Sequence, residues 1–138
     1  MKEYTTEFIR NVALASHGSS GKTMLIEAFA HFTGITTRLG GIQEGNTMAD
    51  FEEEEIRRGL SLSTAVIPIE YKDCKINFLD TPGYTDFVGE MVSGLRVVDG
   101  VLVVVDAVAG AEVGTEVALH YSDQFGLARF VIIDKMDR

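Results

Sequence analysis

The stretch from Ser16 to Thr23, SHGSSGKT, constrains the fold of this chain more than any other part of the sequence. It follows an apolar run, Phe8 to Ala15, that is typical of a short buried strand, and it precedes the run Met24 to Phe32, which has helical spacing. The pattern G-x-x-x-x-G-K-[ST] between a strand and a helix is typical of a loop whose backbone N–H groups surround phosphate oxygens. The sequence therefore predicts a strand, a phosphate-binding loop and a helix, in that order.

Each residue type in this loop has a chemical task. The Lys22 ammonium reaches the terminal phosphates, and the Thr23 hydroxyl holds a magnesium ion. The following helix begins with N–H groups that have no partner within the helix, and these favour an anion. Ser16 replaces the usual first glycine, which we expect to be tolerated only with a negative φ. A second interpretation is a Gly/Ser turn with Lys22 solvated, but the flanking strand and helix patterns favour phosphate binding.

Composition and charge exclude several classes of protein. The length of 138 residues suits one domain, and 46% hydrophobic with 24% charged residues is ordinary for a globular chain. The formal net charge of −9 argues against direct binding of nucleic acid, for which clustered Lys and Arg are expected. The single cysteine, Cys74, cannot form an internal disulfide, and the polar, acidic N-terminus shows no signal peptide. We therefore expect a cytoplasmic protein without a membrane partner.

Strand and helix patterns alternate along the chain. Pro68 lacks a donor for a strand ladder, so we expect its strand at a sheet edge, in an antiparallel hairpin with the next strand. The alternation predicts an α/β fold with a mostly parallel sheet, helices on both faces, and ligands beyond the carboxyl ends of the strands. The expected strands are Phe8 to Ala15, Leu62 to Glu70, Lys75 to Leu79, Gly100 to Asp106 and Ala128 to Ile133, and the expected helices run from Gly21 to about His31, from an Asp86 cap to about Val97, and from Glu112 to Phe125.

The segment Thr33 to Leu60 is rich in glycine and charge and has little periodicity before its acidic run. A loop of this length inside a compact domain is usually functional or disordered, and we expect a functional, mobile one. We interpret the acidic run Glu52 to Glu55 as a solvated helical turn that pairs loosely with Arg57 and Arg58. A contact surface for a partner is the second interpretation of this run.

Two further motifs follow predicted strands. Asp80-Thr81-Pro82-Gly83 comes after the strand KINFL, where the Asp80 carboxylate can hold a magnesium ion through a water and the Gly83 N–H can bond a terminal phosphate. Asp134-Lys135-Met136-Asp137 follows the last strand, and Asp137 can accept from the ring N–H and the exocyclic amine of guanine. Alone, the first motif is equally a turn without a ligand and the second is a weak signal. Both lie on the rim that carries the phosphate loop.

Together, in this order, the three motifs resemble the signature of the translational GTPases, most closely the G domain of elongation factor G and its paralogues. Tyr84 after the D-T-P-G motif makes the chain most similar to the elongation factor G-like paralogues that carry a tyrosine there. The stretches DTPGYTDFVGEMVSGLRVVDGVLVVVDAVAG and EEEEIRRGLSLSTA and the closing KMDR carry the resemblance, which covers nearly the whole chain. It implies a P-loop NTPase fold in which residues 1–138 are the N-terminal part of a GTP-binding domain. That family's domain continues with another strand, helices and a base-contacting loop. We therefore expect a fold truncated at its C-terminal end, from a larger factor whose other domains contact the ribosome.

The resemblance implies GTP or GDP and Mg2+ as ligands, and it assigns roles to residues. Lys22 would contact the β and γ phosphates, and Gly83 would sense the γ-phosphate. Lys135 would lie along the purine ring while Asp137 selects guanine over adenine. Ser61 stands where the family's first switch carries a magnesium-binding threonine. The implied catalytic residues are Lys22, Gly83 and Tyr84; the implied metal ligands are Thr23, Ser61 and Asp80; and the implied nucleotide-binding residues are Ser16, His17, Gly18, Ser19, Ser20, Gly21, Lys22, Thr23, Asp80, Gly83, Asp134, Lys135 and Asp137.

Two residues depart from the family's pattern. Elongation factor G carries a histidine that positions the attacking water where this chain has Tyr84, and a phenol can orient a water but cannot take up a proton as an imidazole does. The family usually has asparagine at position 134, whereas the Asp134 carboxylate offers only lone pairs to the acceptor edge of guanine. We expect slow hydrolysis or another arrangement of the water. We also expect weak guanine binding, with a loss of about 1 to 3 kcal/mol at Asp134.

The leading interpretation is a GTPase that acts as a switch domain in translation. GTP and Mg2+ would draw Ser61 and Gly83 toward the γ-phosphate and order the segment Thr33 to Leu60, and hydrolysis would release it. Two alternatives stay open. One is a guanine-nucleotide switch module with negligible hydrolysis, supported by Tyr84. The other is a P-loop protein that uses ATP, favoured by Asp134 and disfavoured by Asp137 and by the resemblance.

Overall fold

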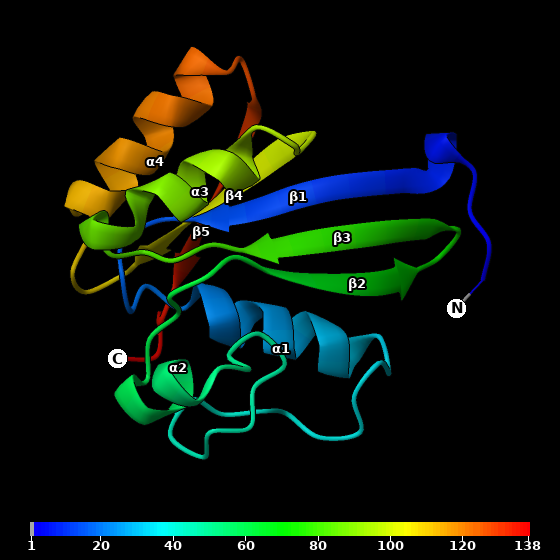
Figure 1. Ribbon diagram of the computed structural model, residues 1–138, viewed down its shortest axis with the longest axis horizontal. Coiled ribbons are helices and arrows are strands. Elements are labelled where there is room, and N and C mark those ends of the chain that lie inside the picture. The colour runs from blue at the N-terminus through cyan, green and yellow to red at the C-terminus, as the bar shows by residue number, and fades with distance from the viewer. Residues whose placement is uncertain (1) are drawn as a thin grey trace.

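The apolar run that precedes the phosphate loop forms the central strand of a five-stranded sheet, β1 (Ile9–Ala15), and its last three side chains, Ala13 to Ala15, are buried on the two faces of the sheet. A computed structural model describes residues 2–138 (Figure 1). The other strands are β2 (Ala65–Tyr71), β3 (Cys74–Asp80), β4 (Gly100–Asp106) and β5 (Ala128–Asp134). The helices are α1 (Lys22–Phe32), α2 (Glu53–Arg58), α3 (Val88–Leu95) and α4 (Val113–Gln124), with 3-10 turns at Thr6–Phe8 and Thr85–Phe87.

The sheet is mixed, with the strand order β2-β3-β1-β4-β5. β1 runs parallel to β3 and β4, and β4 runs parallel to β5, whereas β2 pairs antiparallel with β3. The predicted α/β fold, with a mostly parallel sheet and one antiparallel edge strand, is therefore confirmed. Pro68 lies on that edge strand opposite Asn77, where a residue without an N–H is tolerated.

Helices cover both faces of the sheet, as the sequence predicts (Figure 1). On one face α1 packs against the strands, and the buried apolar side chains there are Leu14, Ile26, Ala30, Ala49, Ala65, Ile67, Ile69, Phe78 and Val104. On the other face α3 and α4 pack against the strands, and the buried set is Ala13, Ala15, Leu79, Met91, Leu95, Val98, Val101, Val103 and Ala118. Among residues 2–138, no helix has the length and apolar character needed to cross a membrane. The two apolar layers hold the carboxyl ends of the parallel strands at one rim.

The start of α3 differs from the prediction. Asp86 does not cap this helix, because the chain first makes the 3-10 turn Thr85–Phe87 and the residue that precedes the helix is Phe87. α3 also ends earlier than predicted, at Leu95. The turn therefore separates the motif that ends at Gly83 from the regular part of the helix.

The acidic run does form a helix, but its interpretation as a solvated turn is wrong at Glu55. This side chain is 0% exposed, and its carboxylate accepts the N–H groups of Phe51, Glu52, Leu62 and Ser63 at 2.9 to 3.2 Å. These contacts help explain why β2 begins at Ala65 and not at Leu62, since the N–H groups of Leu62 and Ser63 donate to Glu55 and that of Thr64 donates to Glu90. One carboxylate therefore joins the two ends of α2.

Two more buried carboxylates organise the segment Thr33 to Leu60. Glu27 of α1 is 1% exposed and accepts the N–H groups of Gly40 and Met48. Asp50 accepts the hydroxyls of Thr47 and Ser61 at 3.0 and 2.8 Å. Figure 1 shows the segment lying beside α1, away from α3 and α4. Backbone and hydroxyl donors, rather than apolar packing alone, hold this long connection against the domain.

The substitution Glu55→Ala tests whether the Glu55 carboxylate joins the two ends of α2. Glu53→Ala, on the exposed side of the same helix, is its matched control. Removing the buried Glu55 carboxylate leaves four partly buried N–H groups without their acceptor, so we expect a loss of about 3 kcal/mol in unfolding free energy. Hydrogen exchange at Leu62 and Ser63 should accelerate in the same variant. Equal stability of the two variants in urea would contradict the assignment.

Candidate functional site

The phosphate loop, Ser16 to Thr23, joins β1 to α1 as predicted, and its conformation depends on two residues. Gly21 precedes α1 with φ 109°, a left-handed conformation that suits glycine. Ser19 also has a positive φ, 63°. Ser16 is not among the residues with positive φ, so the condition for replacing the first glycine is met. The loop thus turns sharply before the first N–H groups of the helix.

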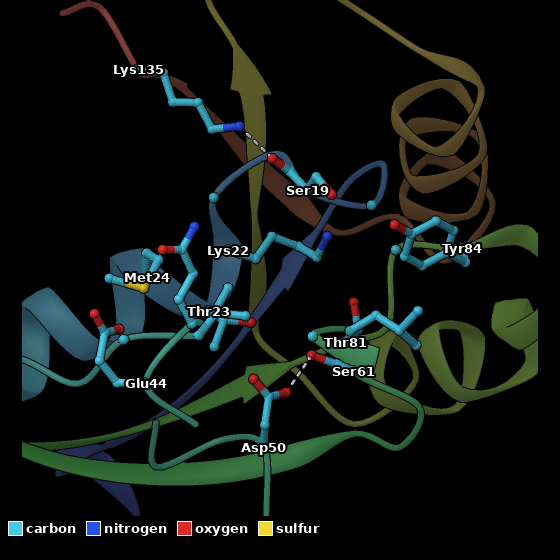
Figure 2. A pocket seen from close by; sticks show the side chains of 18 of the residues that line it. Ser19, Lys22, Thr23, Met24, Glu44, Asp50, Ser61, Thr81, Tyr84 and Lys135 are labelled. Carbon is cyan, nitrogen blue, oxygen red and sulfur yellow. Dashed lines mark hydrogen bonds between the residues drawn. The ribbon is translucent and has the colours of Figure 1, made fainter. Parts of the chain in front are cut away.

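A pocket of about 490 Å³ opens above this loop (Figure 2). Four separate parts of the chain line it: the loop, the long segment, the stretch after β3 and the stretch after β5. The predicted site residues among its lining are Gly18, Ser19, Gly21, Lys22, Thr23, Ser61, Gly83, Tyr84 and Lys135. The structure therefore brings most of the predicted residues to one cavity at the carboxyl ends of the strands.

Lys22 is not a solvated residue of a first helical turn, since it is only 6% exposed. Its Nζ donates to the carbonyl oxygen of His17 at 2.8 Å and lies 3.4 Å from that of Ser16. Burial lowers the pKa of Lys22 to about 8, and the nearby Asp80 opposes this shift. Burying the Lys22 ammonium under the loop costs desolvation free energy. This cost favours the interpretation of the motif as a phosphate-binding loop over a turn with a solvated lysine.

Asp80 ends β3 and lies beside the loop because β3 pairs in parallel with β1, with Asp80 opposite Leu14. The Thr23 hydroxyl donates to Asp80 Oδ2 at 2.6 Å, which leaves the lone pairs of that hydroxyl free. Asp80 Oδ1 is buried and has no hydrogen-bond partner within residues 2–138. Burial raises the pKa of Asp80 to about 6, against the influence of Thr23 and Lys22. An unpartnered carboxylate oxygen beside a free hydroxyl oxygen fits a divalent cation with its waters.

Ser61 reaches the same pocket from the long segment, but its hydroxyl donates to Asp50 at 2.8 Å (Figure 2). Asp50 also lines the pocket and is 6% exposed. No local signal in the sequence marks Asp50, because it lies in the stretch without periodicity. The predicted metal ligand is thus close to the cavity and engaged by a buried carboxylate.

Gly83 and Tyr84 close the pocket over the loop. A Cβ atom at Gly83 would lie 2.5 Å from Lys22 Nζ and 2.6 Å from the Gly18 nitrogen, so only glycine permits this approach. A Cβ atom at Gly18 would lie 2.7 Å from the Tyr84 ring. The Tyr84 ring therefore covers the loop, and Figure 2 shows it on the opposite side of Lys22 from Met24.

The start of α4 supports the loop from outside the pocket, which the sequence did not predict. The hydroxyls of Ser16 and Thr115 are 3.0 Å apart, and the Gly114 N–H donates to His17 Nδ1 at 3.3 Å. His17 Nε2 lies 3.6 Å from a carboxylate oxygen of Glu112. The His17 side chain thus contacts the protein itself through both ring nitrogens.

The stretch after β5 contacts the other end of the loop. Lys135 Nζ donates to the Ser19 carbonyl at 2.5 Å and to Asp106 Oδ2 at 2.7 Å. Asp134 faces Gly21 so closely that a Cβ atom there would lie 1.9 Å from its Oδ2. Asp137 is exposed and is not among the residues that line the pocket. Of the three predicted site residues in the last motif, Asp134 and Lys135 contact the loop and Asp137 does not.

A glycine-rich loop between the first strand and the first helix, with a buried lysine and an aspartate at the next parallel strand, defines an α/β domain of the phosphate-binding-loop class. The sequence matches the family described as "Elongation factor Tu GTP binding domain" over residues 7–138, and the chain belongs to this family. The predicted resemblance to translational GTPases is therefore confirmed.

Individual relatives agree with this family. The chain is 36% identical over 138 residues to "Elongation factor G" of Granulibacter bethesdensis, covering 100% of this chain and 20% of that protein. It is 39% identical over 130 residues to "Elongation factor G 2" of Hahella chejuensis, covering 94% of this chain and 19% of that protein. The chain thus spans about a fifth of the length of these relatives.

Two solved structures share the fold. A crystal structure of a protein from Thermus thermophilus superposes with a TM-score of 0.89 and 41% identity, covering 91% of this chain and 19% of the other. A bacterial selenocysteine-specific elongation factor, EF-Sec, superposes with a TM-score of 0.76 and 27% identity, covering 93% of this chain and 20% of the other. The mixed sheet of this chain is therefore that of a translation-factor GTP-binding domain.

We predict that the buried charge of Asp80 lowers the unfolding free energy of the chain while it supports Mg2+-dependent nucleotide binding. Its pKa rises from 3.8 to about 6 on folding, so between these values the folded chain holds a proton that the unfolded chain releases. Stability should therefore fall as the pH rises through this interval. We expect Asp80→Asn to remove this dependence and to raise the unfolding free energy at pH 7 by about 3 kcal/mol, while it weakens Mg2+-dependent nucleotide binding.

Urea unfolding between pH 4 and 8 measures this effect, with the exposed Asp86→Asn as the control. The control should follow the wild-type curve. An Asp80→Asn chain that is no more stable than the wild type at pH 7 would show that the charge is not destabilising.

Proposed function

We propose that this chain binds guanine nucleotide with Mg2+ and hydrolyses GTP to GDP and phosphate, as the switch domain of a longer elongation factor G-like protein. The observation that carries the proposal is the burial of Lys22 and Asp80 at one glycine-rich loop, with Asp80 Oδ1 left without a partner within residues 2–138. Charges buried in this way are stabilised when a polyanion and a cation bind between them. Family membership supports guanine as the base.

The proposed roles follow from the contacts of each side chain. Lys22 would turn from the His17 carbonyl to the β and γ phosphates, and the backbone from Gly18 to Gly21 would donate N–H groups to them. Thr23 and Asp80, joined by Ser61, would hold the magnesium ion, which neutralises phosphate charge.

The proposed switch uses the two stretches that meet at the pocket. Ser61 and Gly83 would be drawn toward the γ-phosphate, and the segment Thr33 to Leu60 would follow Ser61. Asp50 competes for the Ser61 hydroxyl, so it sets part of the free energy needed for this movement. Loss of the γ-phosphate would return Ser61 to Asp50.

The base would be recognised at the other end of the loop. Lys135 would lie along the purine and Asp137 would accept from the N–H and amine of guanine. This role requires Asp137 to turn from its exposed position toward the pocket. Asp134 faces the loop with a carboxylate, which offers only acceptor lone pairs to the base where an asparagine would offer an N–H donor.

We also propose the setting of this activity. The relatives are named elongation factor G, which supports a role with the ribosome through the longer protein, in the cytoplasm. The formal net charge of −9 supports the absence of direct nucleic-acid contacts by this chain. On β5, Phe130, Val131 and Ile133 are 66%, 54% and 60% exposed, which supports coverage of this edge by a further strand and helices of the same domain.

Isothermal titration of the 138-residue chain with GDP and Mg2+ tests the binding step. We expect a dissociation constant above about 1 μM, since Asp134 offers no donor to the base, and we expect ATP to compete less well than GTP. Absence of GDP binding, or equal competition by ATP, would contradict the proposal. Asp134→Asn should tighten GDP binding about tenfold, whereas Asp137→Asn should weaken it.

A switch module with negligible hydrolysis is the second candidate, and Tyr84 is the observation that favours it. Its ring covers Gly18 and its phenol is a weak proton acceptor. Release of phosphate from GTP by the longer protein, with and without ribosomes, separates the two candidates. If Tyr84 orients the attacking water, Tyr84→Phe should lower the rate at least about tenfold with unchanged GTP affinity. A wild-type protein without turnover on ribosomes would favour the switch module.

A further inference from the structure

We propose that Asp106 is a positioning residue that holds the phosphate loop in its binding conformation through Lys135. The inference rests on the proposed function, because the loop is the part that would hold the nucleotide's phosphates. Asp106 itself lines no part of the pocket, and its role would be exerted through one lysine.

Asp106 is the last residue of β4, and it uses both carboxylate oxygens. Oδ1 accepts the N–H groups of Val108 and Ala109 at 2.8 and 3.1 Å, which fixes the turn that leads toward α4. Oδ2 accepts Lys135 Nζ at 2.7 Å. One side chain therefore connects the end of β4 to the end of β5.

The ion pair is largely removed from solvent. The side chains of Lys135 and Asp106 are 20% and 15% exposed. The pKa of Asp106 is lowered to about 2, first by the hydrogen bond from Lys135 and then by those from the two backbone N–H groups. Asp106 therefore stays ionised at neutral pH and fixes the lysine ammonium at one place.

The held ammonium reaches the phosphate loop. Lys135 Nζ donates to the Ser19 carbonyl at 2.5 Å, and Ser19 is the loop residue that adopts φ 63° without being glycine (Figure 2). A left-handed serine is unfavourable by itself and persists where its surroundings fix it. Lys135 also has a positive φ, 58°, so both partners of this bond are in conformations that need support. Asp106 supplies that support from a third strand end.

The consequence concerns phosphate affinity. A loop that is already in its binding conformation loses less entropy when it binds, so weakening the Asp106–Lys135–Ser19 chain should lower affinity for any di- or triphosphate. Asn at position 106 keeps an oxygen for the turn's N–H groups but removes the charge that holds Lys135. This substitution therefore distinguishes the role of Asp106 in the turn from its role in holding Lys135.

The test is a double-mutant cycle with Asp106→Asn and Lys135→Met in the 138-residue chain, measured by GDP·Mg titration. We expect each single variant to weaken GDP binding about tenfold and the double variant to be no weaker than Lys135→Met alone. Inorganic tripolyphosphate with Mg2+ has no purine for Lys135 to contact, so Asp106→Asn should weaken its binding as much as it weakens GDP binding, because the effect is on the loop. Asp123→Asn, which removes a different ion pair, with Arg129, is the matched control and should leave binding unchanged.

A second readout does not need a nucleotide. Pulse acetylation followed by mass spectrometry should label Lys135 several-fold faster in Asp106→Asn, with the exposed Lys72 as the internal reference. Unchanged labelling, unchanged GDP affinity, or additive effects in the cycle would each overturn the inference. A wild-type chain that binds no GDP would contradict the proposed function, and the labelling, which needs no nucleotide, would then decide separately whether Asp106 holds Lys135.

Discussion

The parallel pairing of β1 with β3 is the constraint on which the site depends. It sets Asp80 opposite Leu14, so a carboxylate lies beside the start of the phosphate loop, and α1 then brings Lys22 and Thr23 to it. The Lys22 ammonium and the Asp80 carboxylate are both buried there, and Lys22 donates to the His17 carbonyl and not to Asp80. The rest of the site is arranged around these two charges. Because apolar side chains pack on both faces of the sheet, these charged groups cannot move into solvent to recover their lost hydration free energy. A ligand that carries both phosphate and cation compensates for this loss instead.

Carboxylates also hold the parts of the chain that meet at this site. Glu55 closes the segment around α2, Glu27 ties that segment to α1, and Asp50 engages Ser61. Each accepts from neutral backbone or hydroxyl donors, which makes its contacts directional and exchangeable. Asp106 also organises the chain, at the other end of the loop, but it accepts from the Lys135 ammonium as well as from two backbone N–H groups. A domain with a net charge of −9 thus uses part of its acidic composition for internal organisation.

The sequence was sufficient where the signal is local. Apolar runs located every strand, Pro68 identified the edge strand, and the loop around Lys22 was recognisable from its flanking elements. It failed where a residue's role depends on contacts distant in the chain. The acidic run looks solvated by composition, yet Glu55 is enclosed by N–H groups from both ends of its segment. Similarly, Thr115 contacts Ser16 and Asp106 contacts Lys135 only because the fold brings distant parts of the chain together. No periodicity in the sequence marks either residue.

The most direct test of this account is an NMR titration of the 138-residue chain with GDP and Mg2+, followed through its backbone amide resonances. The account predicts the largest shifts at Gly18 to Thr23 and at Gly83, with smaller ones at Lys135. Shifts centred instead on the apolar groove between Phe29 and Phe78, with the loop resonances unmoved, would contradict it.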